Sequence, residues 1–571
     1  SGTVSTNWLA TAGFGNTMTN GTGNVSTLAG LNDAFAKGST FNPAPKANAT
    51  FLTTANFTDL SDPFFDKVAY RGAMDATNRW DSGWVEYDPI NKEYKVATSK
   101  TSFIKPVAND KYRVGRSTIL QWDTTSQATN GKTLKFSWSL SASSTSWSAL
   151  PMPKGKLEFV DGTALKATGT VNTTMPNIAT ASLYIKLEDK NDPTFNAIVG
   201  PITVTIPTAG VVDSTLKGDI TGIITLSSTK IYGLDGVVYV QSGGVLRIEP
   251  GTVIKGDNTK TSAICVNRGG IIYANGTAQK PIVMTSGQPV GQRERGDWGG
   301  LLIMGKAKSN LVEAPIEGGI ADDATVKKNA WFGGTDDADS SGVLRYVRVE
   351  FGGIAESPDN ELNGITFGAV GNRTVVDYVQ SSYSGDDSFE WFGGTVNCKH
   401  IIAYNGIDDD FDTDNGYRGK LQFGIGRRFN DIADISNSEA FESDNDASAS
   451  ENQPFTNPIF SNFTAIGGVM DTSYTAWSAG ADYSTRYHPK FLTAAQIRRN
   501  SRMALYNSVL IGWPAGVELT NNNTVRAANA DSVRVKYNDF YGIKANKYFY
   551  AGGSTTFSGT VSTNWLATAG F

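Results

Sequence analysis

The chain has 571 residues, of which 39% are hydrophobic and 18% charged, with a formal net charge of −5 at pH 7. These values indicate a folded protein of two to four domains and exclude a chain that is disordered throughout. They argue against a nucleic-acid partner, which needs clustered lysine and arginine, and no apolar stretch reaches the roughly 18 residues of a membrane span.

The N-terminal segment SGTVSTNWLATAGF, residues 1–14, recurs without a change as residues 558–571. A repeat flush with both ends is typical of a window cut from a periodic chain. It is equally typical of a polymer in which one subunit's end takes the place of the next subunit's start. We therefore expect head-to-tail continuity, either as covalent tandem repeats or as a non-covalent homopolymer. A duplicated tag or cloning scar is the alternative.

Residues 96–210 contain short alternating segments separated by turn residues, such as Thr133–Ser139 and Ser182–Leu187. This spacing predicts a β-sandwich that is immunoglobulin-like in the loose sense. The only cysteines, Cys265 and Cys398, lie outside it, so the disulfide of antibody domains is absent. We expect both thiols to be buried and unpaired.

Residues 211–557 repeat themselves at the spacing of a solenoid. Val240–Val245 is echoed by Val266–Ile271. Later, Phe460–Gly467 is echoed by Leu505–Gly512, and Leu505 onward by Lys536–Tyr541. Short β-rich runs with Gly and Asn corners and almost no helical periodicity predict a parallel β-helix. Such a helix has two open sheet edges that another chain or domain must cover.

An aromatic residue followed by an acid recurs as Phe389-Glu390, Phe411-Asp412 and Phe441-Glu442. If these coils are adjacent, the phenylalanines stack inside and the carboxylates stack about one strand spacing apart. Like charges at ~5 Å repel by on the order of 1 kcal/mol per pair in water, and by more when partly buried. A column of this density predicts a cation beside it.

Calcium fits this column because Ca²⁺ prefers oxygen ligands. The candidate ligands are Asp386, Asp387, Glu390, Asp408, Asp409, Asp410, Asp412, Asp414, Glu442, Asp444 and Asp446. Asp410 to Gly416 has part of the spacing of an EF-hand loop, but Leu421 stands where the final glutamate belongs. The alternative is a solvated acidic corner balanced by Arg418, Arg427 and Arg428.

Parallel β-helices also occur in polysaccharide lyases and glycosidases, which need carboxylates in a cleft lined by aromatic residues. The groups Asp386/Asp387 and Asp408–Asp410 would supply the carboxylates and Trp391 a platform for a sugar. Against this, His400 and His488 lie in no recognisable catalytic pattern, and no HExxH, GxSxG or P-loop sequence occurs. We therefore expect no enzymatic activity.

Several longer segments are distinctive when taken together. They are Val237–Gly256, Gly296–Gly300, Phe332–Thr335, Gly342–Gly353, Ser382–Gly394 (SYSGDDSFEWFGG), Gly406–Tyr417 (GIDDDFDTDNGY) and Phe441–Asp446 (FESDND). The combination resembles a family of secreted Bacteroidota surface proteins with a right-handed parallel β-helix. The resemblance implies an exported cell-surface protein and brings no established enzymatic activity with it.

The order of one segment differs from that family. Phe64–Pro89 resembles the part that closes the C-terminal end of such helices, yet here it precedes the sandwich. Its position implies that residues 1–95 complete the helix of a preceding repeat or a neighbouring subunit, through main-chain pairing and buried aromatics. The expected interface residues are Trp8, Phe14, Phe64, Phe65, Arg71, Trp80, Trp84, Trp565 and Phe571.

The sequence as a whole predicts an all-β extracellular structural protein. We expect it to form a surface filament, fibre or sheath, with further copies of itself as the main partner. Two alternatives stay open. A carbohydrate-binding or adhesive surface module would expose aromatic residues on one face of the helix and bind glycans. A polysaccharide-degrading enzyme would turn over a polyanion.

Overall fold

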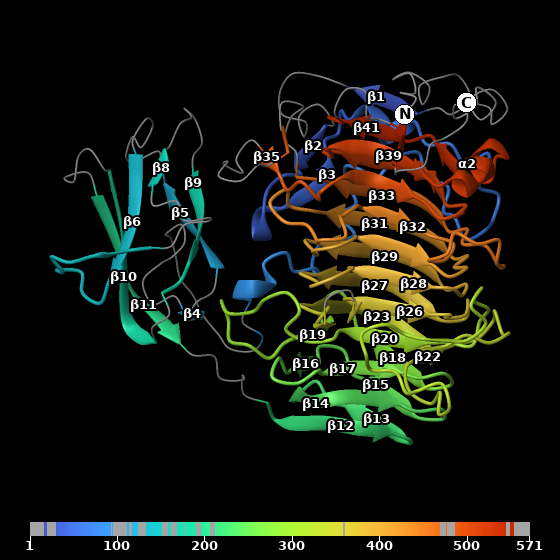
Figure 1. Ribbon diagram of the computed structural model, residues 1–571, viewed down its shortest axis with the longest axis horizontal. Coiled ribbons are helices and arrows are strands. Elements are labelled where there is room, and N and C mark those ends of the chain that lie inside the picture. The colour runs from blue at the N-terminus through green and yellow to red at the C-terminus, as the bar shows by residue number, and fades with distance from the viewer. Residues whose placement is uncertain are drawn as a thin grey trace.

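The computed structural model describes residues 16–19, 30–92, 94, 111–113, 117–123, 133–150, 158–160, 168–176, 179–189, 196–205, 212–357, 360–468, 475–476, 486–543 and 549–552. Within these residues, the largest sheet has 26 strands, all paired in parallel. Apart from the strands at the two ends, each strand pairs with the strands one coil earlier and one coil later, as in a parallel β-helix (Figure 1). The predicted all-β solenoid is thereby confirmed.

The strands of the β-helix follow one another in chain order, apart from the first. They are β1 (Thr17–Thr19), β12 (Ser214–Ile220), β13 (Ile223–Leu226), β14 (Ile231–Val240), β15 (Val245–Ile248), β16 (Val253–Gly256), β17 (Ala263–Val266), β18 (Ile271–Asn275), β19 (Ile282–Ser286), β20 (Leu301–Met304), β23 (Gly342–Glu350), β26 (Ile365–Gly368), β27 (Val375–Ser382), β28 (Phe389–Phe392), β29 (Asn397–Tyr404), β30 (Phe411–Asp414), β31 (Lys420–Arg427), β32 (Phe441–Ser443), β33 (Ile459–Ile466), β36 (Thr493–Ile497), β37 (Ala504–Tyr506), β38 (Val509–Ile511), β39 (Ala515–Thr520), β40 (Arg534–Lys536), β41 (Asp539–Tyr541) and β42 (Phe549–Gly552). One α-helix, α2 (Asn522–Asn529), lies within the described residues, and no helix there is both long and apolar enough to cross a membrane.

The sequence repeats correspond to coils. Val240 of β14 lies beside Val266 of β17, and Phe460 of β33 lies beside Leu505 of β37, as their similarity predicts. The next echo, which aligns Leu505 with Lys536, is wrong by one residue, because Lys536 pairs with Tyr506. The sequence echo aligns the two Tyr-Asn dipeptides with each other, whereas the register of the strands is set by the position of the corner.

That corner is occupied by residues with positive φ in successive coils: Tyr346, Tyr378, His400, Phe423, Asn462, Asn507 and Tyr537. We call this row the corner ladder. A left-handed backbone costs a non-glycine residue on the order of 1 kcal/mol. Stacking offsets this cost, since the ring centroids of Tyr346 and Tyr378 lie 4.5 Å apart and those of Tyr378 and His400 lie 4.3 Å apart.

A second, smaller core lies on the outside of the helix. Outward-facing side chains such as Cys265 and Leu302 are covered there by Ile316 and Phe332 of the long insertion between β20 and β23. Cys265 and Cys398 are both buried and free, as predicted.

The region before the helix consists of antiparallel and mixed sheets. The larger contains β4 (Lys111–Arg113), β11 (Asn196–Thr205), β10 (Thr180–Asp189), β6 (Thr133–Ser139), β7 (Ser148–Ala149) and β8 (Glu158–Val160). In the smaller, β5 (Ser117–Asp123) pairs with β9 (Thr168–Thr174). The segments 133–139 and 182–187, expected as strands, lie in β6 and β10.

Residues 30–92, which we call the strap, lie along the side of this chain's own helix (Figure 1). The strap has little regular structure, namely β2 (Leu31–Asp33), β3 (Asn42–Pro45) and the 3₁₀ turns η2 (Gly38–Thr40), η3 (Thr50–Thr53) and η4 (Pro89–Asn91). Its contacts extend from Arg71 on Asp539 of β41 to Trp84 on Tyr346 of β23.

This placement differs from the expectation that residues 1–95 close a helix end. Among the described residues, β1 alone extends the end, beside β41, whereas the strap covers a lateral face. Phe64, Phe65, Arg71, Trp80 and Trp84 all lie in the strap. The other expected interface residues, Trp8, Phe14, Trp565 and Phe571, lie outside the described residues.

Candidate metal centre

The repeated aromatic–acid pairs form two stacks on opposite sides of one sheet. Glu390, Asp412 and Glu442 are paired in register on β28, β30 and β32. The preceding phenylalanines stack inside, with ring centroids 5.8 and 5.5 Å apart along the series. Neighbouring residues of a strand face opposite sides, so the core that aligns the phenylalanines also aligns the acids. The predicted column is confirmed.

A second acidic row lies at the corner just before these strands. The Asp387 Oδ1 atom accepts the backbone N–H of Asp409 at 2.8 Å, and Asp409 Oδ1 accepts that of Glu439 at 2.5 Å. These three acids each stand two residues before a stacked phenylalanine. The carboxylates therefore step from coil to coil with the strands.

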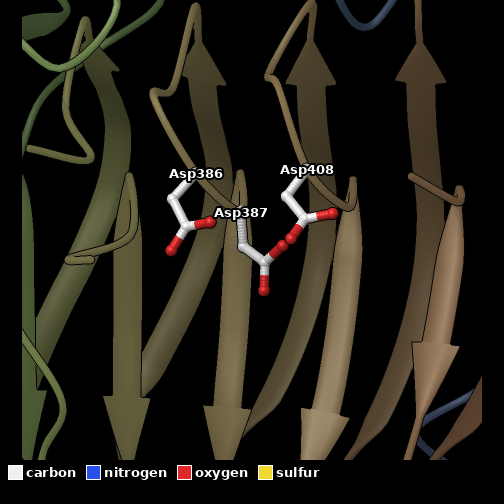
Figure 2. A group of neighbouring side chains, drawn as sticks. All are labelled: Asp386, Asp387 and Asp408. Atoms are coloured by element: carbon white, nitrogen blue, oxygen red, sulfur yellow. The ribbon is translucent and has the colours of Figure 1, made fainter. Parts of the chain in front are cut away.

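Three groups of acids bring one oxygen each within 4.8 Å of one another. They are Asp386, Asp387 and Asp408; Asp387, Glu390 and Asp412; and Asp409, Asp412 and Glu442. Figure 2 shows the first group, in which Asp387 lies between Asp386 and Asp408 and the carboxylates approach one another. Hard cations take ligand sets of this kind.

Among the described residues, the ion pairs with Glu442 and Asp444 lie at one end of the column. Arg498 pairs with Glu442 and, at 2.8 Å, with Asp444, which Arg499 also contacts at 2.6 Å. Within the described part of the chain, no lysine or arginine forms an ion pair with Asp386, Asp387, Asp408 or Glu390.

The arginines expected to balance the column mostly serve other partners. Arg418 pairs with Asp337 at 3.1 Å, and Arg427 lies over the ring of Phe35 in the strap. Arg428 approaches Asp410, with Nη1 3.9 Å from Oδ1. Of these three arginines, Arg428 alone forms an ion pair with a predicted ligand in the described structure, and the charge of Arg427 also acts on Asp410.

Burial dominates the electrostatics of the column. It raises the pKa of Asp387, Glu390 and Asp408 well above the usual range, and the neighbouring carboxylates raise these pKa values further. Burial, with Asp409 and Asp444 nearby, raises the pKa of Asp412 to about 8. The ionised form of these carboxylates is therefore disfavoured in the folded protein unless a positive partner lies nearby.

Three residues at the candidate site, Glu439, Asn363 and Glu317, were not predicted from the sequence. Glu439 is 1% exposed, and its Oε1 has no hydrogen-bond partner within the described structure. Asn363 joins the column by donating Nδ2 to Glu317 at 3.0 Å and to Glu390. The repeated pattern acid-x-Phe-acid at 387–390, 409–412 and 439–442 would have identified Glu439. Glu317 and Asn363 come from other loops, and no local pattern marks them.

The remaining predicted ligands separate into different surroundings. Asp410 is fully buried beside Arg428, and Asp444 pairs with Arg498 and Arg499. Asp414 and Asp446 line a half-open cavity of about 330 Å³. Among its other lining residues are Glu317, Phe332 and Phe392.

Two aromatic candidates are structural. Trp391, expected as a sugar platform in the enzyme alternative, is fully buried and stacks with Phe367 and Tyr417. His400 belongs to the corner ladder, and its Nδ1 lies 2.8 Å from Asp377 Oδ1. Neither side chain is placed to contact a substrate.

A family model described as "Pectate-lyase like beta helix domain" matches residues 218–569, which is more than half of the chain. Neither the curated proteins nor the solved structures gave a match.

Proposed function

We propose that this chain, which belongs to the family of pectate-lyase-like β-helix domains, is an extracellular structural protein built around its β-helix. In this proposal, copies join head to tail into a surface filament, fibre or sheath. The driving force is the satisfaction of unpaired backbone groups at the open ends of the helix.

The observation that supports this proposal most directly is the pairing of β1 with β41 at the end of the helix. Thr17 pairs with Asp539 across a separation of more than 500 residues. Asn16 accepts the Asn538 N–H at 2.7 Å and donates Nδ2 to the Val535 carbonyl at 2.9 Å. Asn538 makes the same two contacts one coil earlier, with the Ser508 N–H and the Leu505 carbonyl. This repetition supports an end that accepts a further strand by main-chain pairing.

The opposite end supports the same proposal. In β13, Ile223 is 67% exposed and Ile224 is 37% exposed, although Ile224 pairs with the fully buried Leu246 of the next coil. Within the described residues, the first coil therefore presents apolar side chains together with a strand edge that has no pairing partner. A surface of this kind favours association over solvent exposure.

Calcium has a structural role in this proposal. The group Asp386, Asp387 and Asp408 would hold Ca²⁺ through its carboxylate oxygens, at the end of the column that the arginines do not reach. The three carboxylates have no ion-pair partner among the described residues, which supports a missing positive charge in this group. The ion would remove the repulsion between carboxylates of neighbouring coils and make the β-helix more rigid.

Assembly is tested with the full chain by light scattering and electron microscopy. We expect filaments that shorten when Thr17→Pro and Thr19→Pro remove backbone N–H groups from β1, since the Thr17 N–H donates to the Asn538 carbonyl at 2.8 Å. The exposed control Ser143→Ala should leave their length unchanged. A full chain that stays monomeric up to millimolar concentration would overturn the proposal.

An enzyme acting on polysaccharide is the second candidate, and the cavity beside the column favours it. Glu317, Asp414 and Asp446 line this cavity together with two phenylalanines. Turnover of an acidic polysaccharide that is lost in Asp414→Asn would establish it. A glycan-binding module has less support, because Tyr273 alone among the described large aromatic side chains is more than a third exposed.

A further inference from the structure

Three buried amide side chains of the helix hold the backbone of the strap. Gln380 accepts the Glu86 N–H at 3.0 Å and donates to the Glu86 carbonyl at 2.8 Å. Gln422 holds Asp66 in the same way, with both bonds 2.8 Å long. Asn507 does so with Asn56, at 2.8 and 2.9 Å. Each amide thus imitates the partner residue of a β-bridge.

Complementary charges run alongside these amides. Lys399 pairs with Asp66 at 2.6 Å, Lys420 with Asp62, and Lys536 with Asp59 at 3.1 Å. The lysines belong to β29, β31 and β40, whereas all three aspartates belong to the strap. Individually such surface pairs contribute little, but the series fixes the register of the strap along the helix.

Two tryptophans anchor the strap on the corner ladder. Trp80 meets the ring of His400 edge-on, with centroids 5.0 Å apart, and Trp84 meets Tyr346 and Tyr378 at 5.9 and 6.0 Å. Both indoles are nearly buried. Buried aromatic anchors surrounded by polar contacts are typical of a binding interface.

We propose that the groove formed by these amides, lysines and ladder rings is a docking site for the strap of a second copy of this chain. Copies exchange residues 30–92, and this exchange is the joint of the filament. The inference rests on the proposed assembly and names the segment that carries it. Swapping an identical element preserves every contact described above.

The connection to the rest of the chain permits this exchange. The strap ends near Tyr94, and β4 begins at Lys111, so residues 95–110 link the two. Sixteen residues reach at most about 58 Å when extended, which allows the strap to seat on either copy. A short linker gives the closed form an effective concentration on the order of millimolar. Dilute protein therefore stays closed, and exchange needs crowding or a weakened closed form.

Charge reversal separates the two forms. The groove variant carries Lys399→Glu and Lys420→Glu, and the strap variant carries Asp62→Lys and Asp66→Lys. Each alone opposes like charges in the closed form, whereas a mixture offers matched pairs in both directions between copies. We expect the mass measured by light scattering to at least double on equimolar mixing. A chain with all four substitutions restores opposite charges within one copy and is the folding control.

A second measurement does not depend on how the variants fold. Equal amounts of ¹⁵N-labelled and unlabelled wild-type chain are assembled together and treated with a carbodiimide, which joins Lys399 to Asp66 as an amide. Cross-linked peptides with one labelled and one unlabelled half confirm exchange.

Cross-links within single isotopes only would overturn the strap exchange. Filaments in that same sample would leave the proposed assembly standing with a different joint. Mixed-isotope cross-links in a sample of short oligomers without filaments would support the exchange and count against the filament.

Discussion

Gly426 makes the space in which the carboxylate of Asp410 is buried. A Cβ at Gly426 would lie 2.6 Å from Asp410 Oδ2, closer than real contacts allow. Asp410 itself is fully buried, with Arg428 3.9 Å away. A glycine one residue before the end of β31 is therefore required by the acid on the neighbouring corner.

Gly426→Ala should destabilise the protein, because the added methyl forces the buried carboxylate away from Arg428. We expect a loss of about 1–3 kcal/mol, the usual cost of overpacking, measured by urea unfolding. The matched control is Gly222→Ala, since a Cβ at Gly222 would meet nothing within 4 Å. Equal losses in the two variants would refute the packing argument.

Calcium should raise the thermal unfolding midpoint of the protein. An ion present at a hundredfold excess over its dissociation constant adds about 2.7 kcal/mol to the stability. The double variant Asp387→Asn, Asp408→Asn should lose this response, because it removes two of the three carboxylates in the uncompensated group.

The metal-free double variant should be at least as stable as the metal-free wild type, since it also removes repulsion. Asp323→Asn, a substitution at an exposed acid, is the control and should keep the full calcium response. An unchanged midpoint in wild type at millimolar calcium would remove the metal from the proposal.

The metal-free protein should lose stability as the pH rises from about 4 to about 8. Burial raises the pKa of Asp387, Glu390 and Asp408 in the folded state. The folded chain then binds more protons than the unfolded one above about pH 4, the pKa of a free aspartate. The contribution of these acids to the stability is thus fully present below that value and falls as the pH rises toward 8, the approximate pKa of Asp412.

Thermal midpoints in metal-stripped buffer at pH 5 and pH 8 measure this effect. Calcium should reverse the trend, because the ion binds only ionised carboxylates. A midpoint that rises with pH without any metal would contradict the burial argument.

Trp80→Ala should release the strap without unfolding the helix. Removing a buried tryptophan costs about 3–5 kcal/mol, and this one also loses its hydrogen bond to the Ala73 carbonyl at 2.7 Å. Limited proteolysis should cut residues 30–92 in the variant while the helix resists. Trp147→Ala, which lies outside the helix and the strap, should leave the strap protected.

Particular residues show where sequence reasoning succeeded. Phe389, Phe411 and Phe441 repeat with their acids, and any fold that stacks the rings must stack the acids too. Their register followed from the sequence because inner packing and strand alternation are local rules. The one-residue slip at Lys536 arose where letters matched but the corner position did not.

Other features depended on distant loops. Arg498 and Arg499 reach Asp444 from more than 50 residues away, and Glu317 reaches the column from the insertion. Nothing in the local sequence announces these contacts. In the sequence, the strap resembled a segment that closes the end of the helix. In the structure, the amides and lysines that bind it lie on five coils along the side of the helix.

The sequence by itself determined the β-helix and the acidic column, because both repeat once per coil and each repeat contains the side chains that determine how it packs. Only the tertiary structure decided which carboxylates lack a positive partner and which face the strap covers. Those outcomes depend on where irregular segments pack against the β-helix. The free energy of that packing is distributed over side chains hundreds of residues apart.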